Sequence, residues 1–336
     1  KLFLEYVKNK KKLISFKKNN ILIGDLIYDT YLRITLRPTV SLNDPLLKNI
    51  FFRSLKILKE TQKYFKDNNI RYVMPSHVCY ITYGIISRVA ATKNIPIIKI
   101  KSENRGNSLF GLHKVSPKYC LDEPPYWDYK KIFKAFPTHK KQEFLNIGKK
   151  ILKKRTSGKY DKNLPYMKGD QFSKETKKIK FNKEKKSIII FPHCYFDNPH
   201  RYRKMIFEDY YHQVKFFLDL SKKFTMYDWY YKPHPNELHS DLDVHKEILK
   251  DYKNINYLFK STSHSDILKL NPQCIITNHG TIAHEYASFK IPVINTGDNP
   301  HINYDFCIHA KNKRHLNIIM QNLTTSIKKI DFDKKK

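Results

Sequence analysis

Short apolar runs alternate with longer amphipathic stretches along much of the chain. In the first half, this pattern predicts strands at 20–25, 71–76 and 95–100, and helices at 44–67 and 80–94. Strands that alternate with helices through short connections are typical of a parallel sheet covered by helices. The first half is therefore expected to fold as a βαβαβ unit.

A second alternation of the same kind begins after residue 185. The apolar runs predict strands at 186–193, 224–233, 255–259, 273–278 and 291–296, and the amphipathic stretches predict helices at 203–222, 263–269, 281–290 and 314–329. We expect an α/β protein with two Rossmann-like lobes and a cleft between them.

The two alternations suggest domain boundaries. Residues 127–155 are rich in lysine and have a helical pattern, whereas 156–185 are polar and charged and are interpreted as a linker or mobile flap. The predicted organisation is an N-terminal domain at 1–155, the linker, and a C-terminal domain at 186–330. A length of 336 residues suits two domains of roughly 150 residues each.

Polar residues follow directly on several predicted strands. They occur in the segments "GD" (24–25), "PSH" (75–77), "PHC" (192–194), "KPHP" (232–235) and "TNHGT" (277–281). Ligands of parallel α/β sheets bind beyond the carboxyl ends of the strands. These segments are therefore expected to face the cleft and to hold the chemistry of the protein.

The segment "ITNHGTIAHE" leads from a strand through His279 and Gly280 into a helix that opens near Thr281. A helix N-terminus attracts anions, Gly280 permits close approach of a phosphate, and the Thr281 hydroxyl can cap the helix or bind an oxygen. Glu285, one turn further on, can accept hydrogen bonds from the two hydroxyls of a ribose. Phosphate and ribose together indicate a nucleotide, although a simple threonine cap with a surface glutamate is the structural alternative.

The segment "YYKPHPNE" (230–237) has two prolines that bracket a histidine. Proline fixes φ and removes a backbone donor, so the segment is expected to form a stiff corner that presents Lys232 and His234 in one orientation. Lysine supplies charge to a phosphate and histidine donates a hydrogen bond to it. A proline-stiffened turn with a solvated histidine remains the alternative.

The formal net charge of +33 raises the question of an anionic partner. Only 10 of the 64 basic residues are arginine, the usual bidentate partner of phosphates and guanines, so nucleic acid is not the expected partner. We expect part of the charge to be compositional and the rest to attract the protein to an anionic membrane surface. No run of 18 apolar residues is present, and five widely spaced cysteines without a CxxC pair indicate reduced thiols in the cytoplasm.

Two of these segments resemble a known family. "YYKPHPNE" followed by "TNHGTIAHEYASFKIPVI" is similar to the donor-binding domain of GT-B glycosyltransferases, especially the Kdo-transferase-like enzymes of bacterial capsule and surface-polysaccharide biosynthesis. The segments 191–213, 23–33 and 80–98 also resemble this family. One departure is Lys290, where the family has glycine before "IPV", so the turn after that helix is expected to adopt another shape.

The resemblance implies a function and a set of roles. The expected activity is metal-independent transfer of a sugar from a CMP-, UDP- or GDP-linked donor to a growing capsule or lipopolysaccharide glycan or glycolipid. No cofactor is expected, and the protein is expected to lie at the inner face of the plasma membrane. The resemblance implies that the donor phosphate is held by Lys232, His234, His279, Gly280 and Thr281, and the ribose by Glu285.

The remaining roles concern the donor sugar and the acceptor. His193 and Asp197 are expected to contact the donor sugar or phosphate, or else to form a turn with an Asx-type bond. Asp25, at the end of the first strand, is the candidate general base with His77 behind it, because an inverting transfer needs one group to take the acceptor proton. Asp25 could equally cap the helix that begins near Leu26.

Other functions share these features. A glycerophosphotransferase of teichoic-acid type would move a phosphoalditol from a nucleotide-linked donor, and a nucleotide-sugar epimerase would need no acceptor. A basic RNA-binding protein with aromatic stacking platforms is the non-enzymatic alternative. It is disfavoured because the aromatic residues fall in predicted strands and helix cores.

Overall fold

The computed structural model describes residues 2–105, 107–115, 129–157, 172, 184–201, 205–235, 237, 239–299, 302–330 and 332. The chain divides into two compact units. The first contains 1–124 and 195–212, and the second contains 125–194 and 213–336. This division differs from the predicted boundaries, because 129–155 groups with the C-terminal half and 195–212 groups with the N-terminal half. Most of the predicted linker at 156–185 lies outside the described residues.

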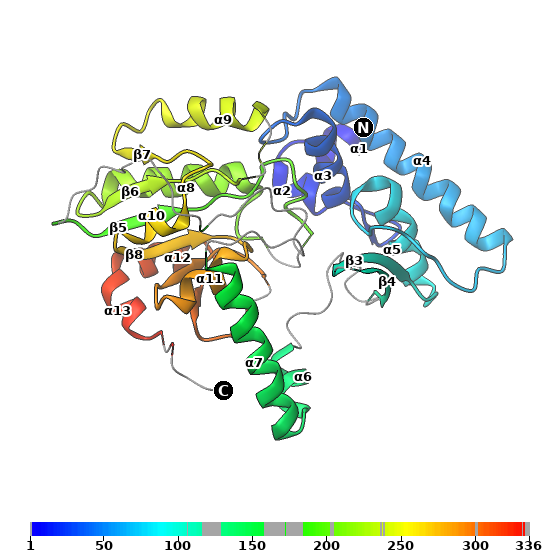
Figure 1. Ribbon diagram of the computed structural model, residues 1–336. Coiled ribbons are helices and arrows are strands. Elements are labelled where there is room, and N and C mark those ends of the chain that lie inside the picture. The colour runs from blue at the N-terminus through cyan, green and yellow to red at the C-terminus, as the bar shows by residue number, and fades with distance from the viewer. Residues whose placement is uncertain are drawn as a thin grey trace. The chain divides into compact units, whose positions relative to one another are not determined.

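The second unit is built on a six-stranded parallel sheet (Figure 1). Its strands are β5 (Ser187–Ile190), β6 (Asp228–Tyr231), β7 (Ile255–Tyr257), β8 (Pro272–Thr277), β9 (Val293–Asn295) and β10 (Cys307–His309). The spatial order β10-β9-β8-β5-β6-β7 is that of a doubly wound Rossmann sheet, with the order reversing between β5 and β8. The predicted α/β class and its parallel sheet are confirmed.

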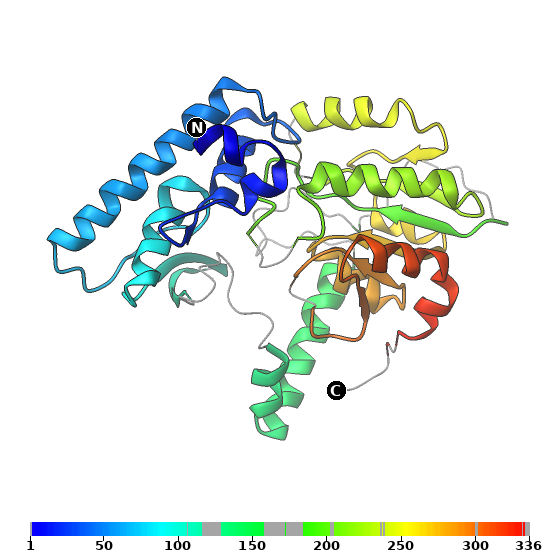
Figure 2. The ribbon, with the colours of Figure 1, turned by 180° about the vertical axis from the view of Figure 1, so that it is seen from behind.

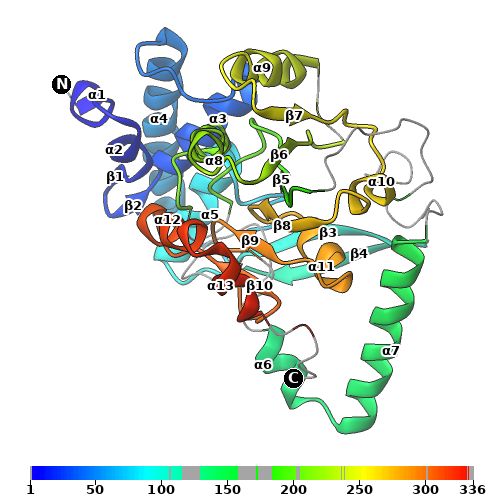
Figure 3. The same cartoon turned by 90° about the vertical axis from the view of Figure 1, so that its left-hand side faces the viewer.

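Helices cover both faces of this sheet. Figure 3 shows α8 (Tyr210–Lys223) and α12 (Lys313–Gln321) on one face and α10 (His264–Leu268) and α11 (Ile282–Ser288) on the other. Two further helices, α9 (His239–Leu249) and α13 (Leu323–Lys328), complete the C-terminal half. A buried apolar cluster with Ile189, Tyr230 and Ile275 joins the strands to α10 and α11. This burial fixes the strand ends, and with them the loops that carry polar residues.

The strands predicted in the C-terminal half are all present, four of them shorter than predicted and β8 with the predicted length but one residue earlier. The 186–193 strand ends at Ile190, before Pro192, and β10 was not predicted because its three residues alternate too briefly to give a pattern. Lys290 has a φ of 59°, the left-handed conformation that glycine commonly adopts just after a helix. The expectation of a different turn shape at this position stays a prediction.

The first unit is mainly helical. Its elements are α1 (Leu2–Tyr6), α2 (Lys10–Ile14), α3 (Gly24–Thr35), α4 (Pro45–Asp67), the π-helix η1 (Tyr80–Gly84), α5 (Ile85–Thr92) and two antiparallel pairs, β1 (Lys17–Lys18) with β2 (Ile21–Leu22) and β3 (Ile98–Arg105) with β4 (Asn107–Lys114). The long α4 packs on α3 and α5 (Figures 1 and 2). The helices predicted at 44–67 and 80–94 are confirmed.

The strands predicted in the N-terminal half differ from those observed. The first ends at Leu22 and the chain becomes helical at Gly24, where a Cβ would lie 1.8 Å from the Leu13 carbonyl oxygen. In the described residues, parallel pairing in this unit is limited to a bridge between Val73 and Ile97. The strand predicted at 95–100 instead opens the antiparallel hairpin β3–β4. Periodicity alone could not distinguish these short apolar segments from strands of a parallel sheet.

Residues 129–155 form two helices, α6 (Tyr129–Ala135) and α7 (Thr138–Arg155), joined by a short turn. They belong to the second unit, and Figures 1 and 3 show α7 extending away from the sheet of that unit. The helical character predicted for this segment is confirmed over its described part.

Candidate functional site

A pocket lies at the carboxyl ends of β5, β6 and β8, where the strand order of the Rossmann sheet reverses. This position is the usual ligand site of a doubly wound sheet. The lining residues come from the end of β8, from the loops after these strands and from the three helices α7, α10 and α11: Arg155, Phe191, Pro192, His193, Lys232, Pro233, His234, Pro235, His264, Thr277, Gly280, Thr281, Ile282 and Glu285.

Lys232 is the central cation of the pocket. Its side chain is almost fully buried, with 1% exposed, and its Nζ donates a hydrogen bond to the Lys260 carbonyl oxygen at 3.1 Å. Burial lowers the pKa of Lys232 to about 8, and the nearby Glu237 carboxylate offsets only part of this effect. A buried ammonium that is poorly compensated favours the entry of an anion.

Three histidine rings lie together beside Lys232. The His193 ring centroid is 4.4 Å from that of His279 and 5.7 Å from that of His234. The Nδ1 atom of His234 is 3.6 Å from the Cys194 Sγ atom. The prolines on either side of His234 thus hold its ring near the loop after β5, as the sequence predicted for a stiff corner.

His264 was not predicted as a site residue, although it lines the same pocket. Its Nδ1 atom lies 3.0 Å from the Tyr286 hydroxyl. Burial lowers the pKa of His264 well below its ordinary value, and the positive charges of Lys232 and Arg155 lower it further. His264 is therefore neutral at physiological pH, and it shares the pocket with both cations, Lys232 and Arg155.

The loop after β8 brings backbone close to the pocket. A Cβ on Gly280 would lie 3.0 Å from the Thr277 Oγ1 atom, so a larger residue here would crowd the loop. Thr281 is the N-cap residue of α11, but its side chain makes no capping hydrogen bond. The exposed Thr281 hydroxyl lines the pocket instead, which contradicts the simple threonine cap considered as an alternative.

Glu285 is buried and is the carboxylate of the pocket. Its Oε1 atom accepts a hydrogen bond from the Arg155 Nε atom at 3.0 Å. The Arg155 guanidinium also lies over the Phe172 ring, 5.8 Å from its centroid. Glu285 is therefore buried, whereas the structural alternative treated it as a surface glutamate. Arg155 was not predicted from the sequence, because it lies 130 residues away from Glu285, at the end of α7.

The pocket brings together most of the residues predicted to bind a donor. Lys232, His234, Gly280, Thr281 and Glu285 all line it. His193 lines it as well, and His279 touches the His193 ring. Asp197 does not belong to this group, because the chain has passed into the first unit by residue 195.

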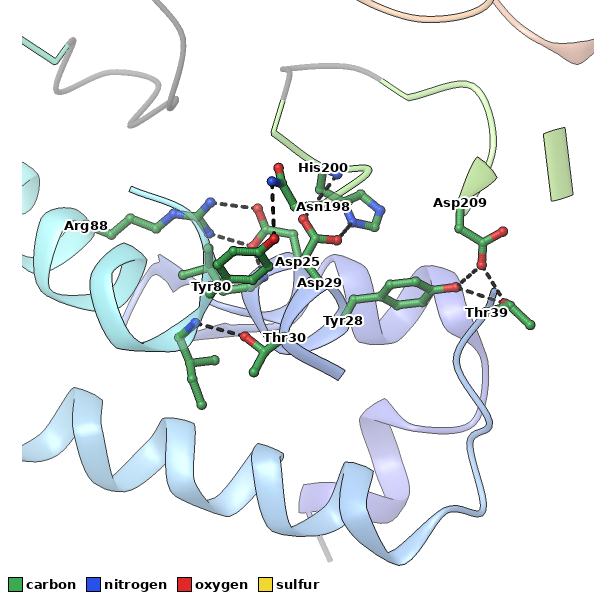
Figure 4. A network of polar contacts seen from close by, with 12 residues as sticks. Asp25, Tyr28, Asp29, Thr30, Thr39, Tyr80, Arg88, Asn198, His200 and Asp209 are labelled. Atoms are coloured by element: carbon green, nitrogen blue, oxygen red, sulfur yellow. Dashed lines mark hydrogen bonds and ion pairs between the residues drawn. The ribbon is translucent and has the colours of Figure 1, made fainter. Parts of the chain in front are cut away.

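The other predicted residues, Asp25 and His77, lie in the first unit, and Figure 4 shows Asp25 with its partner Arg88. Asp25 is in the first turn of α3, where its Oδ1 atom accepts a hydrogen bond from the Leu26 amide at 2.9 Å. Both carboxylate oxygens also bind the Arg88 guanidinium, at 2.5 and 2.7 Å. The N-cap of α3 is Ile23, so Asp25 lies inside the first turn and does not cap the helix, and both of its oxygens are engaged by Arg88 rather than available as a base. His77 is exposed, with its ring against Tyr83.

A second carboxylate of α3 forms a pair that the sequence did not reveal (Figure 4). Asp29 is buried, and its Oδ1 atom lies 2.5 Å from the Nδ1 atom of His200. The His200 amide also donates to Asp29 Oδ2 at 3.2 Å. The Nε2 atom of His200 is buried and has no hydrogen-bond partner, and the same is true of the Asn198 Oδ1 atom. Buried polar atoms of this kind commonly mark a site that is completed by water or a ligand.

The backbone around His200 is also unusual. Asn198 has a φ of 28° and Tyr80 has a φ of 59°, at the start of the π-helix η1. The side-chain Nδ2 atom of Asn198 donates a hydrogen bond to the Tyr80 hydroxyl at 3.5 Å. The two residues are 118 positions apart in the sequence. Strained backbone and π-helical turns cluster at functional sites. The combination makes this region a second candidate site.

The described residues lack two features that would bear on function. The part of the chain that the structure describes contains no group of three or more His, Cys, Asp or Glu residues placed to hold a metal ion. Within the same ranges, no helix has the length and apolar character needed to cross a bilayer.

No protein-family model matches the sequence, and no curated protein matches it significantly. Among solved structures, the chain is similar to KpsC of Thermosulfurimonas dismutans, a beta Kdo 2,4 transferase, with 11% identity over 69% of this chain and 71% of that chain and a TM-score of 0.42. It is also similar to the UDP-GlcNAc 2-epimerase of Neisseria meningitidis bound to UDP-GlcNAc, with 14% identity, coverage of 83% and 76%, and a TM-score of 0.34. The S. aureus MnaA–UDP structure has 15% identity over 83% of this chain and 72% of that chain, with a TM-score of 0.34. At TM-scores below 0.5, these similarities do not assign a function to this chain.

Proposed function

We propose that the protein is a glycosyltransferase that binds a nucleotide sugar in the pocket at the ends of β5, β6 and β8 and transfers the sugar to a glycan or glycolipid hydroxyl. The observation that carries the proposal is the buried Lys232 at the switch point of a Rossmann sheet, with His193, His234 and Arg155 around it. This arrangement suits a ligand with a diphosphate or a monophosphate.

The pocket residues have distinct roles in this proposal. Lys232 and His234, with the backbone at Gly280 and the Thr281 hydroxyl, hold the donor phosphate. As the bond between the sugar and the phosphate breaks, these donors stabilise the charge that develops on the departing nucleotide. Glu285 binds the ribose hydroxyls, which requires that the ligand displace or share the Arg155 contact. Arg155 is then available to a phosphate oxygen.

The acceptor hydroxyl must lose a proton when it attacks the anomeric carbon. Among the residues of the first unit, His200 is better suited than Asp25 to act as the base that accepts this proton. The Nδ1 atom of His200 is oriented by Asp29 and its Nε2 atom has no partner, whereas both oxygens of Asp25 are bound to Arg88. A histidine oriented by a carboxylate is a recurrent general base.

A panel of CMP, CDP, UDP and GDP in a thermal-shift assay tests the binding part of the proposal. At least one nucleotide is expected to raise the unfolding midpoint, because a ligand that binds only the folded form stabilises it. Lys232→Ala is expected to abolish the shift, and Lys223→Ala, on the last turn of α8, is expected to keep it. A shift that survives Lys232→Ala, or a panel without any shift in a protein that is stabilised by RNA, would show the proposal to be wrong.

The products distinguish transfer from the related chemistries. With a nucleoside-diphosphate donor, sugar transfer releases the nucleoside diphosphate and requires an acceptor. Transfer of a phosphoalditol breaks the bond between the two phosphates and releases the nucleoside monophosphate. An epimerase converts the donor without any acceptor. For a nucleoside-diphosphate donor, analysis of the released nucleotide therefore separates the three reactions. For a CMP-linked sugar, whose transfer also releases the nucleoside monophosphate, the mass gained by the acceptor separates a sugar from a phosphoalditol.

A further inference from the structure

The hairpin of α6 and α7, residues 129–155, is strongly basic. It contains nine lysines and one arginine against a single acidic residue, Glu143, which gives a formal net charge of +9. Every residue of α7 is described, and none of them is buried. The hairpin thus presents about a quarter of the net charge of the chain on a single exposed element.

The exposed face of α7 also contains large apolar side chains. Phe144, Ile147 and Ile151 recur at helical spacing and share one side of the helix, and 38%, 45% and 60% of them are exposed. Lys149 and Lys153 fall on the opposite side of the helical wheel and Lys150 on its flank, whereas Lys140 lies on the apolar side and Leu145 lies among the lysines. A helix that buries none of its residues in its own protein and exposes large apolar side chains together with many lysines is suited to binding at a membrane surface.

The hairpin is anchored at both of its ends. At the start of α6, the Lys130 Nζ donates to the Asn303 carbonyl oxygen at 3.0 Å and lies 3.7 Å from an Asp305 carboxylate oxygen. At the end of α7, Arg155 binds Glu285. The turn between the helices is held by an edge-to-face contact between Phe136 and Phe144, with ring centroids 5.1 Å apart. The exposed surface is therefore presented by a supported element rather than by a loose tail.

We propose that the α6–α7 hairpin docks the protein on an anionic bilayer surface, with the lysines among the lipid headgroups and Phe144, Ile147 and Ile151 at the boundary with the acyl chains. Charge complementarity identifies the partner as anionic. Lysine, rather than arginine, supplies nine of the ten cations, and nucleic-acid phosphates would leave the apolar positions without a partner. A lipid surface accommodates both kinds of side chain.

Sedimentation of the full chain with lipid vesicles tests this inference. The vesicles contain either phosphatidylcholine alone or phosphatidylcholine with about one third phosphatidylglycerol. The protein is expected to sediment with the anionic vesicles only, and less at high salt, because added ions screen the headgroup charge. Reversing Lys149, Lys150 and Lys153 to glutamate is expected to lower the partition coefficient by at least about tenfold.

Matched controls separate the hairpin from the general charge of the chain. Lys48, Lys59 and Lys63 are exposed lysines of α4, and their reversal to glutamate changes the net charge by the same amount. This control is expected to bind vesicles nearly as well as the unaltered protein. For the apolar part, Ile151→Ser is expected to weaken binding, whereas Met226→Ser, at a residue with 61% exposure against 60% for Ile151, is expected to leave it unchanged.

Three outcomes would overturn the inference. The first is an equal loss of vesicle binding in the two charge-reversal variants, and the second is binding to vesicles of phosphatidylcholine alone. The third is a protein that does not bind vesicles but binds a fluorescent RNA tightly through the hairpin lysines. The thermal-shift response to nucleotides is expected to be the same in the hairpin triple variant and the unaltered protein. Failure of membrane docking and failure of the proposed nucleotide site are therefore separable.

Discussion

Lys232 places an ammonium group with a depressed pKa where an anion is expected. With a pKa of about 8, the group is protonated at neutral pH and loses its charge as the pH rises further. We predict that the dissociation constant of the nucleotide identified by the panel increases by roughly tenfold between pH 7 and pH 9, as measured by calorimetry. The unfolded lysine keeps its proton up to about pH 10.4, so across this window the contribution of Lys232 to the free energy of unfolding increases with pH.

The variant Lys232→Arg provides the control for this titration. Arginine stays protonated throughout the range, so the variant is expected to bind with little dependence on pH even if the altered shape weakens its affinity. The same pH dependence in Lys232→Arg as in the unaltered protein would assign the titration to another group.

His200 provides a second prediction at the level of single residues. Burial lowers the pKa of His200, but the Asp29 carboxylate outweighs this effect and the pKa is raised from its ordinary value. A general base must be neutral, so the rate of sugar transfer is expected to rise with pH through this elevated pKa. Removing the carboxylate charge with Asp29→Asn is expected to move that limb of the pH profile to lower pH. His200→Gln is expected to lower kcat by about a hundredfold or more while the donor KM stays nearly unchanged.

His212 is the matched control for His200. It is also a histidine of the first unit whose Nδ1 atom lies against a buried carboxylate, in this case 2.6 Å from Asp209. His212→Gln is expected to retain most of the activity. Equal loss of activity in the two variants, or a pH profile that Asp29→Asn leaves in place, would mean that the Asp29–His200 pair only supports the fold.

At the scale of elements, the turn that ends α11 contains Lys290, a residue with a side chain in the left-handed conformation. The Lys290 amide donates to the Ala287 carbonyl at 3.0 Å and the Ile291 amide donates to the Tyr286 carbonyl at 3.1 Å. This closure requires a left-handed residue, a conformation that costs an L-residue with a side chain about 1–2 kcal/mol. We predict that Lys290→Gly raises the free energy of unfolding by about 1 kcal/mol in urea denaturation.

A glycine at a right-handed helix end provides the comparison. Lys329 is an exposed C-cap residue of α13 with a φ of −79°, so it has no left-handed strain to relieve. Lys329→Gly is expected to leave the stability unchanged or to lower it by up to about 1 kcal/mol. If the two variants responded alike, the strain assigned to Lys290 would be absent.

For the whole molecule, the sequence predicted the second unit far better than the first. Strand-length apolar runs such as Ser187–Ile190 and Pro272–Thr277 are buried on both faces, and this burial makes them recognisable as strands of a parallel sheet. The segment at 20–25 is equally apolar, but only Ile21–Leu22 forms a strand, in an antiparallel pair, and a helix begins at Gly24, where the backbone packs tightly. Such a contact depends on tertiary structure and has no local signature.

The candidate sites divide in the same way. The pocket residues that follow β6 and β8 could be predicted, because strand ends and prolines are visible in the sequence. The contact between Asp29 and His200 spans 171 residues, and that between Arg155 and Glu285 spans 130, so no spacing rule connects them. Only packing of the folded chain brings these charges together.

The route of the chain between its two units limits how the protein can be divided. After β5 the chain leaves the second unit, contributes 195–212 to the first, and then returns. Within that stretch Asp209 is buried and accepts hydrogen bonds from the hydroxyls of Tyr28 and Thr39, both at 2.5 Å. A fragment that starts at residue 186 would retain Asp209 but lose Tyr28 and Thr39. The Asp209 carboxylate would then lack the two hydroxyl donors that it has in the full chain. Each half is therefore a poor candidate for separate expression, because the chain passes between the units at three positions, whereas the sequence predicted a single linker.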